Sequence, residues 1–143
     1  VEKTKQEGAK VLLGGKRPSG FNKGFYYEPT IFDDVQDNFT IMKQEPFGPL
    51  VPMLSFKTFD EVIERANNND LGLCSYICTN SMEQAHRASE LMETGTVAVN
   101  TPLVAIAEAP FGGIKQTGYG REGGSMAIKD YLNVKYTHLG IKG

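Results

Sequence analysis

The middle of the chain alternates short apolar runs with amphipathic stretches. Three runs are rich in β-branched and aromatic residues, which strands favour: Leu50 to Phe56, Leu73 to Thr79 and Thr96 to Asn100. Between them, Thr58 and Ser81 each begin a capping box, in which Glu or Gln follows three residues later, ahead of an amphipathic stretch. The order strand, helix, strand, helix, strand is typical of α/β folds with parallel strands.

Shorter elements flank this middle part. We predict the end of a helix over Glu2 to Lys10, strands over Val11 to Leu13 and Phe25 to Phe32, a helical turn over Phe39 to Gln44 and a short helix over Ser125 to Leu132. Gly95 is predicted to end the second amphipathic helix as its C′ residue. Val134 to Ile141 is predicted to be a terminal strand. Because both its faces are of mixed polarity, we expect it to pair with another chain.

Composition limits the class of protein. The 143 residues are 40% hydrophobic and 22% charged, which favours one globular domain. The net charge of -2, without any block of like charge, gives no indication of nucleic acid or of a membrane surface as a partner. Two cysteines form no disulfide framework, which favours a reducing, cytoplasmic compartment. The charged helical start at Val1 is typical of a chain cut from something larger.

The stretch Pro110 to Gly124, PFGGIKQTGYGREGG, has six glycines in fifteen residues. It follows the strand that ends at Asn100, and the carboxyl ends of such strands carry the functional loops of α/β sheets. It is either a floppy surface loop or a tightly wound wall of a ligand site. Gly118 to Gly123 matches G-x-G-x-x-G, but it follows no buried strand and lies in no βαβ unit, so we reject a Rossmann fingerprint.

The segment Glu45 to Pro49, EPFGP, is rigid because two prolines restrict its backbone. It presents one carboxylate, which can accept two ribose hydroxyls, and one ring, which can cover a flat heterocycle. The alternative is a plain turn into the next strand, with Phe47 buried. From the residues alone the two interpretations are equally good.

The cysteines suggest no chemistry of their own. Cys74 and Cys78 are expected on one face of a buried strand, which favours a structural role over a nucleophile. His86 and His138 have no ligand-type spacing to them, so we predict no metal site.

Three segments, KQEPFGPLVPMLSF, GTVAVN and PFGGIKQTGYGREGG, resemble in order and spacing the C-terminal part of NAD(P)-dependent aldehyde dehydrogenases. The resemblance runs from about Val11 to Ile141, and the ending is most similar to the succinate-semialdehyde dehydrogenase branch. It implies an α/β fold: the C-terminal part of the catalytic domain over 1–132, an open, mostly parallel sheet with flanking helices, and an oligomerisation strand over 133–143.

The resemblance also implies roles for individual residues. Glu45 resembles the glutamate that binds the nicotinamide ribose hydroxyls, and Phe47 the phenylalanine beside the nicotinamide ring, so NAD or NADP is the implied cofactor. Phe111 resembles the aromatic residue that lines the aldehyde tunnel. Glu122 resembles a glutamate proposed to relay protons during deacylation. Val134 to Ile141 resembles the strand that joins subunits in a homo-dimer or tetramer.

Two departures from the family pattern matter. The segment Leu103 to Ala107, with Ile106, is an apolar part of the implied tunnel, whereas succinate-semialdehyde enzymes carry serines there. This difference favours a less polar aldehyde. The family's nucleophilic cysteine, general base and cofactor domain would lie before Val1, so this chain alone is expected to be inactive. The second hypothesis is a non-catalytic nucleotide-binding or interaction module that retains this half of the fold.

Overall fold

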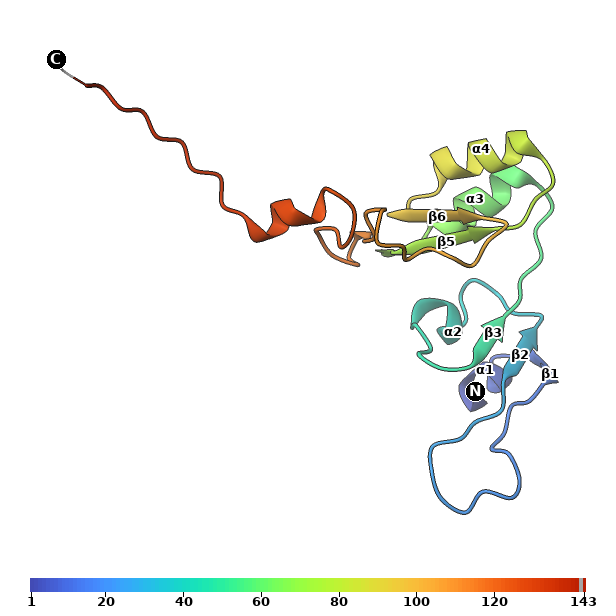
Figure 1. The fold of residues 1–143 in the computed structure, drawn as a ribbon. Helices are drawn as coiled ribbons and strands as arrows, with labels where there is room; N and C mark the ends of the chain where they lie inside the picture. Colours follow the sequence, from blue (N-terminus) through green and yellow to red (C-terminus); the bar gives the residue numbers. More distant parts are fainter. Residues whose placement is uncertain (142) are drawn as a thin grey trace. The chain divides into compact units, whose positions relative to one another are not determined.

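The structure is a computed structural model that describes residues 1–141 and 143. The chain forms two compact units, Val1–Arg65 and Ala66–Gly143, and the boundary falls near the end of a helix. In Figure 1 the first unit runs from blue to green and the second from green to red. Each unit contains sheet structure of its own. No helix of the described residues is both long and apolar enough to cross a membrane.

The first unit is a three-stranded mixed sheet with helices. Its elements are α1 (Glu2–Gln6), β1 (Lys10–Leu13), β2 (Thr30–Asp33), α2 (Thr40–Lys43), β3 (Leu50–Pro52) and α3 (Phe59–Asn67), whose last residues pass into the second unit. In the order β1-β2-β3, β2 pairs antiparallel with β1 and parallel with β3. The sheet places the start of β3, and with it the segment that precedes β3, beside β2.

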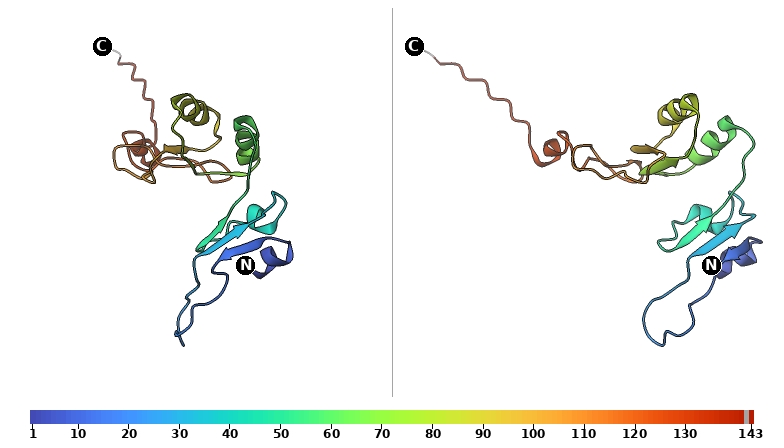
Figure 2. Two further views of the ribbon diagram at one scale, coloured as in Figure 1. Left: turned by 90° about the vertical axis from the view of Figure 1, so that its right-hand side faces the viewer. Right: turned by 45° about the vertical axis from the view of Figure 1, so that its right-hand side comes forward.

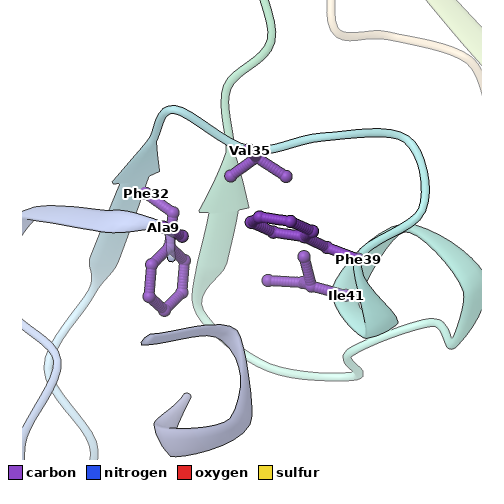
Figure 3. Close-up of a cluster of buried hydrophobic side chains, with 5 residues drawn as sticks. All are labelled: Ala9, Phe32, Val35, Phe39 and Ile41. Atoms are coloured by element: carbon purple, nitrogen blue, oxygen red, sulfur yellow. The ribbon is translucent and has the colours of Figure 1, made fainter. Parts of the chain in front are cut away.

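The core of the first unit is a small cluster around Phe32, whose side chain is fully buried. Ala9, Val35, Phe39 and Ile41 complete it, and Figure 3 shows the five side chains gathered between the strands and α2. Phe39 and Ile41 come from the first residues of α2 and the residue before it. The predicted helical turn therefore forms because it buries two apolar side chains against β2, not because it is stable by itself.

The second unit contains two separate strand pairs. Its elements are β4 (Leu71–Gly72), β5 (Cys74–Ile77), α4 (Met82–Leu91), β6 (Thr96–Val99), β7 (Ile114–Lys115) and a 3₁₀ helix (Ala127–Tyr131). β5 and β6 pair in parallel, with α4 as the crossover on one side of the pair in every view (Figure 1, Figure 2). Ala88 of α4 and Ala98 of β6 are buried. β4 and β7 pair antiparallel, which was not predicted.

Both predicted helix starts are confirmed by their caps. The Glu61 backbone N–H donates to the Thr58 hydroxyl at 3.2 Å, and the Gln84 N–H donates to the Ser81 hydroxyl at 3.2 Å. The Glu61 carboxylate also accepts from the backbone N–H of Lys57 at 2.8 Å. These hydrogen bonds, the Lys57 bond first, hold the pKa of Glu61 below its usual value. Local hydrogen bonds of this kind are what make helix starts readable from sequence.

The α/β class is confirmed, but the sheets are mixed rather than mostly parallel, because β1 and β7 run antiparallel to their partners. The strand predicted over Phe25 to Phe32 begins only at Thr30, after Pro29, which has no backbone N–H to donate. The segment Val134 to Ile141, predicted to be a strand, has no strand partner among the residues that the structure describes, and Val134 is fully exposed. Its pairing with a second chain stays a prediction.

Candidate functional site

The first candidate segment, Glu45 to Pro49, connects α2 to β3. Its last residue is bound to the sheet: the Thr30 backbone N–H at the start of β2 donates to the Pro49 carbonyl at 2.8 Å. A tight turn precedes that point, because the Gly48 N–H donates to the Pro46 carbonyl at 2.6 Å. The segment is therefore a short, turned loop fixed to the sheet.

Both predicted side chains of this loop face solvent. Glu45 is exposed, and Phe47 is 98% exposed. The alternative in which Phe47 is buried beneath a turn is therefore wrong for this chain. Ordering this loop costs conformational entropy. The exposed ring and carboxylate return no packing within the unit to offset that cost. Such an arrangement is typical of a binding loop.

The second candidate segment brings Phe111 and Glu122 together. The Phe111 N–H donates to the Glu122 carbonyl at 2.7 Å, and the Glu122 N–H donates to the Phe111 carbonyl at 2.7 Å. This isolated antiparallel bridge closes the glycine-rich stretch into a loop. Both residues line a pocket of about 340 Å³, which is also lined by Leu73, Gly112, Gly113, Thr117, Gly118, Tyr119, Gly120, Arg121, Asp130 and Tyr131.

Close backbone contacts explain why this loop needs glycine. A Cβ atom on Gly95 would lie 1.9 Å from the Gly112 carbonyl oxygen, and one on Gly112 would lie 2.6 Å from the Gly120 carbonyl oxygen. These three chain segments approach so closely that no side chain fits between them. The loop is therefore tightly wound rather than floppy, and its role as the wall of a ligand site stays a prediction. Gly95 does not end its helix, since α4 ends at Leu91.

Two basic side chains hold the loop, Arg121 by bonds within it and Lys115 by bonds to residues outside it. Arg121 donates through Nη1 to the carbonyls of Gly113 at 2.9 Å and of Gly120 at 2.6 Å. Lys115 adopts a left-handed backbone with a φ of 56°. Its Nζ donates to the carbonyls of Asn67 at 2.8 Å and Asn69 at 3.0 Å, at the end of α3, and pairs with the Glu93 carboxylate. These roles were not predicted, although cations set among glycines were a signal for them.

The apolar segment Leu103 to Ala107 reaches the same loop. The Gly124 N–H donates to the Ala107 carbonyl at 2.8 Å, and the Ala109 N–H donates to the Ile106 carbonyl at 3.3 Å. Ile106 is thereby held beside the end of the glycine-rich stretch, and its side chain is 43% exposed. Leu103 is 67% exposed and lies earlier on the same segment.

The G-x-G-x-x-G match at Gly118 to Gly123 is not followed by an α-helix in the structure. A dinucleotide-binding fingerprint would have to open such a helix.

Comparison with known proteins identifies the family of this chain. The profile described as "Aldehyde dehydrogenase family" matches residues 1–137, which is nearly the whole chain. The chain belongs to the aldehyde dehydrogenase family. The resemblance inferred from the three motifs is therefore confirmed, and succinate-semialdehyde dehydrogenases are among the relatives.

Relatives of this aldehyde dehydrogenase chain are much longer. It is 45% identical over 141 residues to the mitochondrial succinate-semialdehyde dehydrogenase of Arabidopsis thaliana, covering 98% of this chain and 26% of the relative. It is 47% identical over 129 residues to human retinal dehydrogenase 2, covering 90% of this chain and 24% of the relative. The NAD⁺ complex of an aldehyde dehydrogenase from Bacillus cereus superposes with a TM-score of 0.92 at 45% identity, covering 99% of this chain and 28% of that structure. The chain thus spans about a quarter of its curated relatives.

The two cysteines of this aldehyde dehydrogenase chain lie outside both loops. Cys74 is half-buried in β5, and Cys78, just after the strand, is exposed. The expectation that both are buried is wrong for Cys78 and is met only in part for Cys74, because β5 ends at Ile77 and, over the described residues, pairs with β6 alone. Over the described part of the chain, no group of three or more His, Cys, Asp or Glu side chains could hold a metal ion.

Proposed function

We propose that this chain is part of an oxidoreductase that oxidises an aldehyde to a carboxylic acid with NAD or NADP. The observation that carries the proposal is the Phe111–Glu122 bridge beside a pocket, in a chain that belongs to the aldehyde dehydrogenase family. In the proposed reaction a cysteine thiolate adds to the aldehyde carbon, giving a thiohemiacetal. Hydride then leaves that carbon, and water hydrolyses the resulting thioester. When bound, NAD(P) accepts the hydride.

The nucleophilic cysteine of this proposal belongs to polypeptide outside this chain. Cys74 is half-buried within a strand, and neither it nor Cys78 lines the pocket at Phe111. A nucleophilic thiolate needs a neighbouring base or an electropositive environment. We therefore propose that the 143 residues alone catalyse no turnover and supply only part of the site.

Glu45 and Phe47 are the proposed cofactor residues. The Glu45 carboxylate is exposed on a loop fixed to the sheet, and a carboxylate has the acceptor sites to bind two ribose hydroxyls. Phe47 presents a fully solvated ring two residues further on, where it can cover the nicotinamide. The solved relative from Bacillus cereus was determined as its NAD⁺ complex, which supports a dinucleotide cofactor.

Phe111, Leu103 and Ile106 are the proposed walls of the aldehyde tunnel. All three are apolar. The bond from the Gly124 N–H to the Ala107 carbonyl fastens the segment of Leu103 and Ile106 to the glycine-rich loop, and the bridge to Glu122 fixes Phe111 in that loop. An apolar wall favours an aldehyde with a less polar tail than succinate semialdehyde. The named relatives act on chemically different aldehydes at 45% and 47% identity, so the wall chemistry is a better guide than overall identity. Glu122 is proposed to relay a proton during deacylation.

We also propose that the protein is a homo-dimer or tetramer joined through Val134 to Ile141. This segment pairs with no strand in the described part of the chain, and Val134, Tyr136 and Ile141 are 103%, 84% and 90% exposed. Exposed apolar residues in an extended segment favour pairing with a strand of another subunit. The same exposure favours the second candidate function, a non-catalytic interaction module.

We propose a cytoplasmic location, although the Arabidopsis relative is mitochondrial.

The test of the proposal uses the full-length protein that contains this chain. Aldehyde-dependent formation of reduced cofactor is measured with NAD and with NADP, for the wild type and for Glu45→Gln. We expect turnover, and a KM for the cofactor raised about tenfold in Glu45→Gln, because an amide is a weaker acceptor than a carboxylate. Glu64→Gln, an exposed glutamate on α3, is the matched control. Absence of aldehyde oxidation with both cofactors would select the interaction module.

A further inference from the structure

We propose that Glu7 is a positioning residue for the cofactor loop, and that it acts by holding α2 in place. The inference rests on the proposed function of Glu45 and Phe47. Glu7 is the C-cap residue of α1 and does not belong to the loop or to the helix that leads into it. All the groups concerned lie within the first unit, Val1–Arg65.

The Glu7 carboxylate contacts Thr40, the first residue of α2, through both of its oxygens. The Thr40 backbone N–H donates to Oε2 at 3.0 Å and to Oε1 at 3.2 Å. The Thr40 hydroxyl donates to Oε1 at 2.5 Å. The residue before it, Phe39, is the N-cap and makes no side-chain cap hydrogen bond. A side chain from 33 residues earlier therefore supplies the acceptor that the N-cap residue lacks.

A helix as short as α2 depends on such a contact. It has four residues, and helices of that length do not form in water by themselves. Its first backbone N–H groups have no partner within the helix, and a negative charge at this end is favourable. The Thr40 hydroxyl first, then its backbone N–H and the charges of Lys3 and Lys43, hold the pKa of Glu7 below its usual value against the opposing effect of burial. The contact is thus made by the carboxylate.

The contact is coupled to the cofactor loop through one helical turn. The Gln44 N–H donates to the Thr40 carbonyl at 2.9 Å, and Gln44 is the residue directly before Glu45. Thr40 is therefore held at its N–H and hydroxyl by Glu7, while its carbonyl fixes the start of the loop. The other end of the loop is fixed at Pro49 by β2. Loss of the Glu7 contact frees one of the two ends and so raises the entropy that cofactor binding must overcome.

The role predicts a selective kinetic effect. In the full-length protein, Glu7→Gln is expected to raise the KM and the dissociation constant for the cofactor about fivefold to tenfold, the loss expected for one typical net hydrogen bond. The kcat and the KM for the aldehyde are expected to change less than about twofold, since the loop contributes binding rather than chemistry. Glu2→Gln is the control: Glu2 lies on α1 and accepts from Lys5 at 2.8 Å, not from α2, so this variant should leave all three constants unchanged.

Two variants at Thr40 make the test specific. Thr40→Val removes the hydroxyl at nearly constant shape and should raise the cofactor KM as Glu7→Gln does, whereas Thr40→Ser retains the hydroxyl and should restore the wild-type value. A purely structural role would lower thermal stability in Glu7→Gln without any split between cofactor and aldehyde constants. That result would overturn the proposal, as would failure of both Glu7→Gln and Thr40→Val to fold.

Glu45→Gln, measured in parallel, separates this inference from the proposed function. If Glu45→Gln leaves the cofactor KM unchanged, the loop is not a cofactor site and the proposed function fails. If Glu45→Gln raises that KM while Glu7→Gln and Thr40→Val do not, the loop binds the cofactor and only the positioning role of Glu7 is wrong.

Discussion

Replacing Gly95 with alanine tests whether close backbone packing builds the pocket at Phe111. The added Cβ would lie 1.9 Å from the Gly112 carbonyl oxygen and 2.8 Å from the Gly112 carbonyl carbon. Gly95 is not among the residues with positive φ, so alanine is compatible with its backbone conformation and the clash alone decides the outcome. The obstructing atoms are backbone, which cannot rotate away as the end of a side chain does.

The cost follows from what has to move. Overpacking of an interior costs about 1–3 kcal/mol when side chains can adjust, and here the backbone of Gly112 must shift instead, so we expect at least about 3 kcal/mol. That lowers the folded-to-unfolded ratio by roughly a hundredfold. Because Gly112 directly follows Phe111, the shift also disturbs the bridge to Glu122. We expect the kcat/KM for the aldehyde to fall by about tenfold or more.

The assay is denaturant unfolding of the full-length protein, followed by circular dichroism, with aldehyde kinetics on the same samples. Gly48→Ala is the stability control, because a Cβ there has no heavy atom within 4 Å and its φ is not in the left-handed region. It should change stability by less than about 0.5 kcal/mol. If Gly95→Ala proves as stable as Gly48→Ala, the close approach does not constrain the loop and our explanation of its glycines is wrong.

Three further predictions follow from the described contacts. Lys115→Met leaves the carbonyls of Asn67 and Asn69 without their donor and should cost about 0.5–1.5 kcal/mol in the same unfolding assay, because both carbonyls are accessible to water. The fold lowers the pKa of Glu7, so its stabilising effect should be complete above the ordinary value of 4.5 and be lost progressively as pH falls from there through the lowered pKa of the folded state. The stability difference between wild type and Glu7→Gln should therefore shrink on acidification. Exposed Cys78 should react with an alkylating reagent faster than half-buried Cys74, as peptide mapping can show.

Local interactions made part of this molecule predictable from sequence. The starts of α3 and α4 depend on hydrogen bonds that close within four residues, at Thr58 and Ser81, so the residues that make them are neighbours in the chain. The rigidity of Glu45 to Pro49 comes from its own two prolines. Family membership was also readable, because the motifs are long and occur in a fixed order.

Long-range interactions account for what was missed. The pairing of β4 with β7 joins residues more than forty positions apart, and nothing in a two-residue strand shows its partner beforehand. Gly95 was expected to end a helix, since glycine commonly does so, but its actual constraint is the backbone of Gly112. The burial predicted for Cys78 was wrong because it assumed a wider sheet than the described residues form.

The amino-acid sequence by itself determined the family, the α/β class, the two capped helices and the two segments that carry the candidate site residues. Only the tertiary structure decided that Phe111 and Glu122 are bridged, that Phe47 is exposed, and that the Glu7 carboxylate caps α2. The physical reason is the range of the interactions. Caps and prolines act on their neighbours, whereas a bridge or a distant cap exists only after folding has brought separated backbone groups within hydrogen-bonding distance.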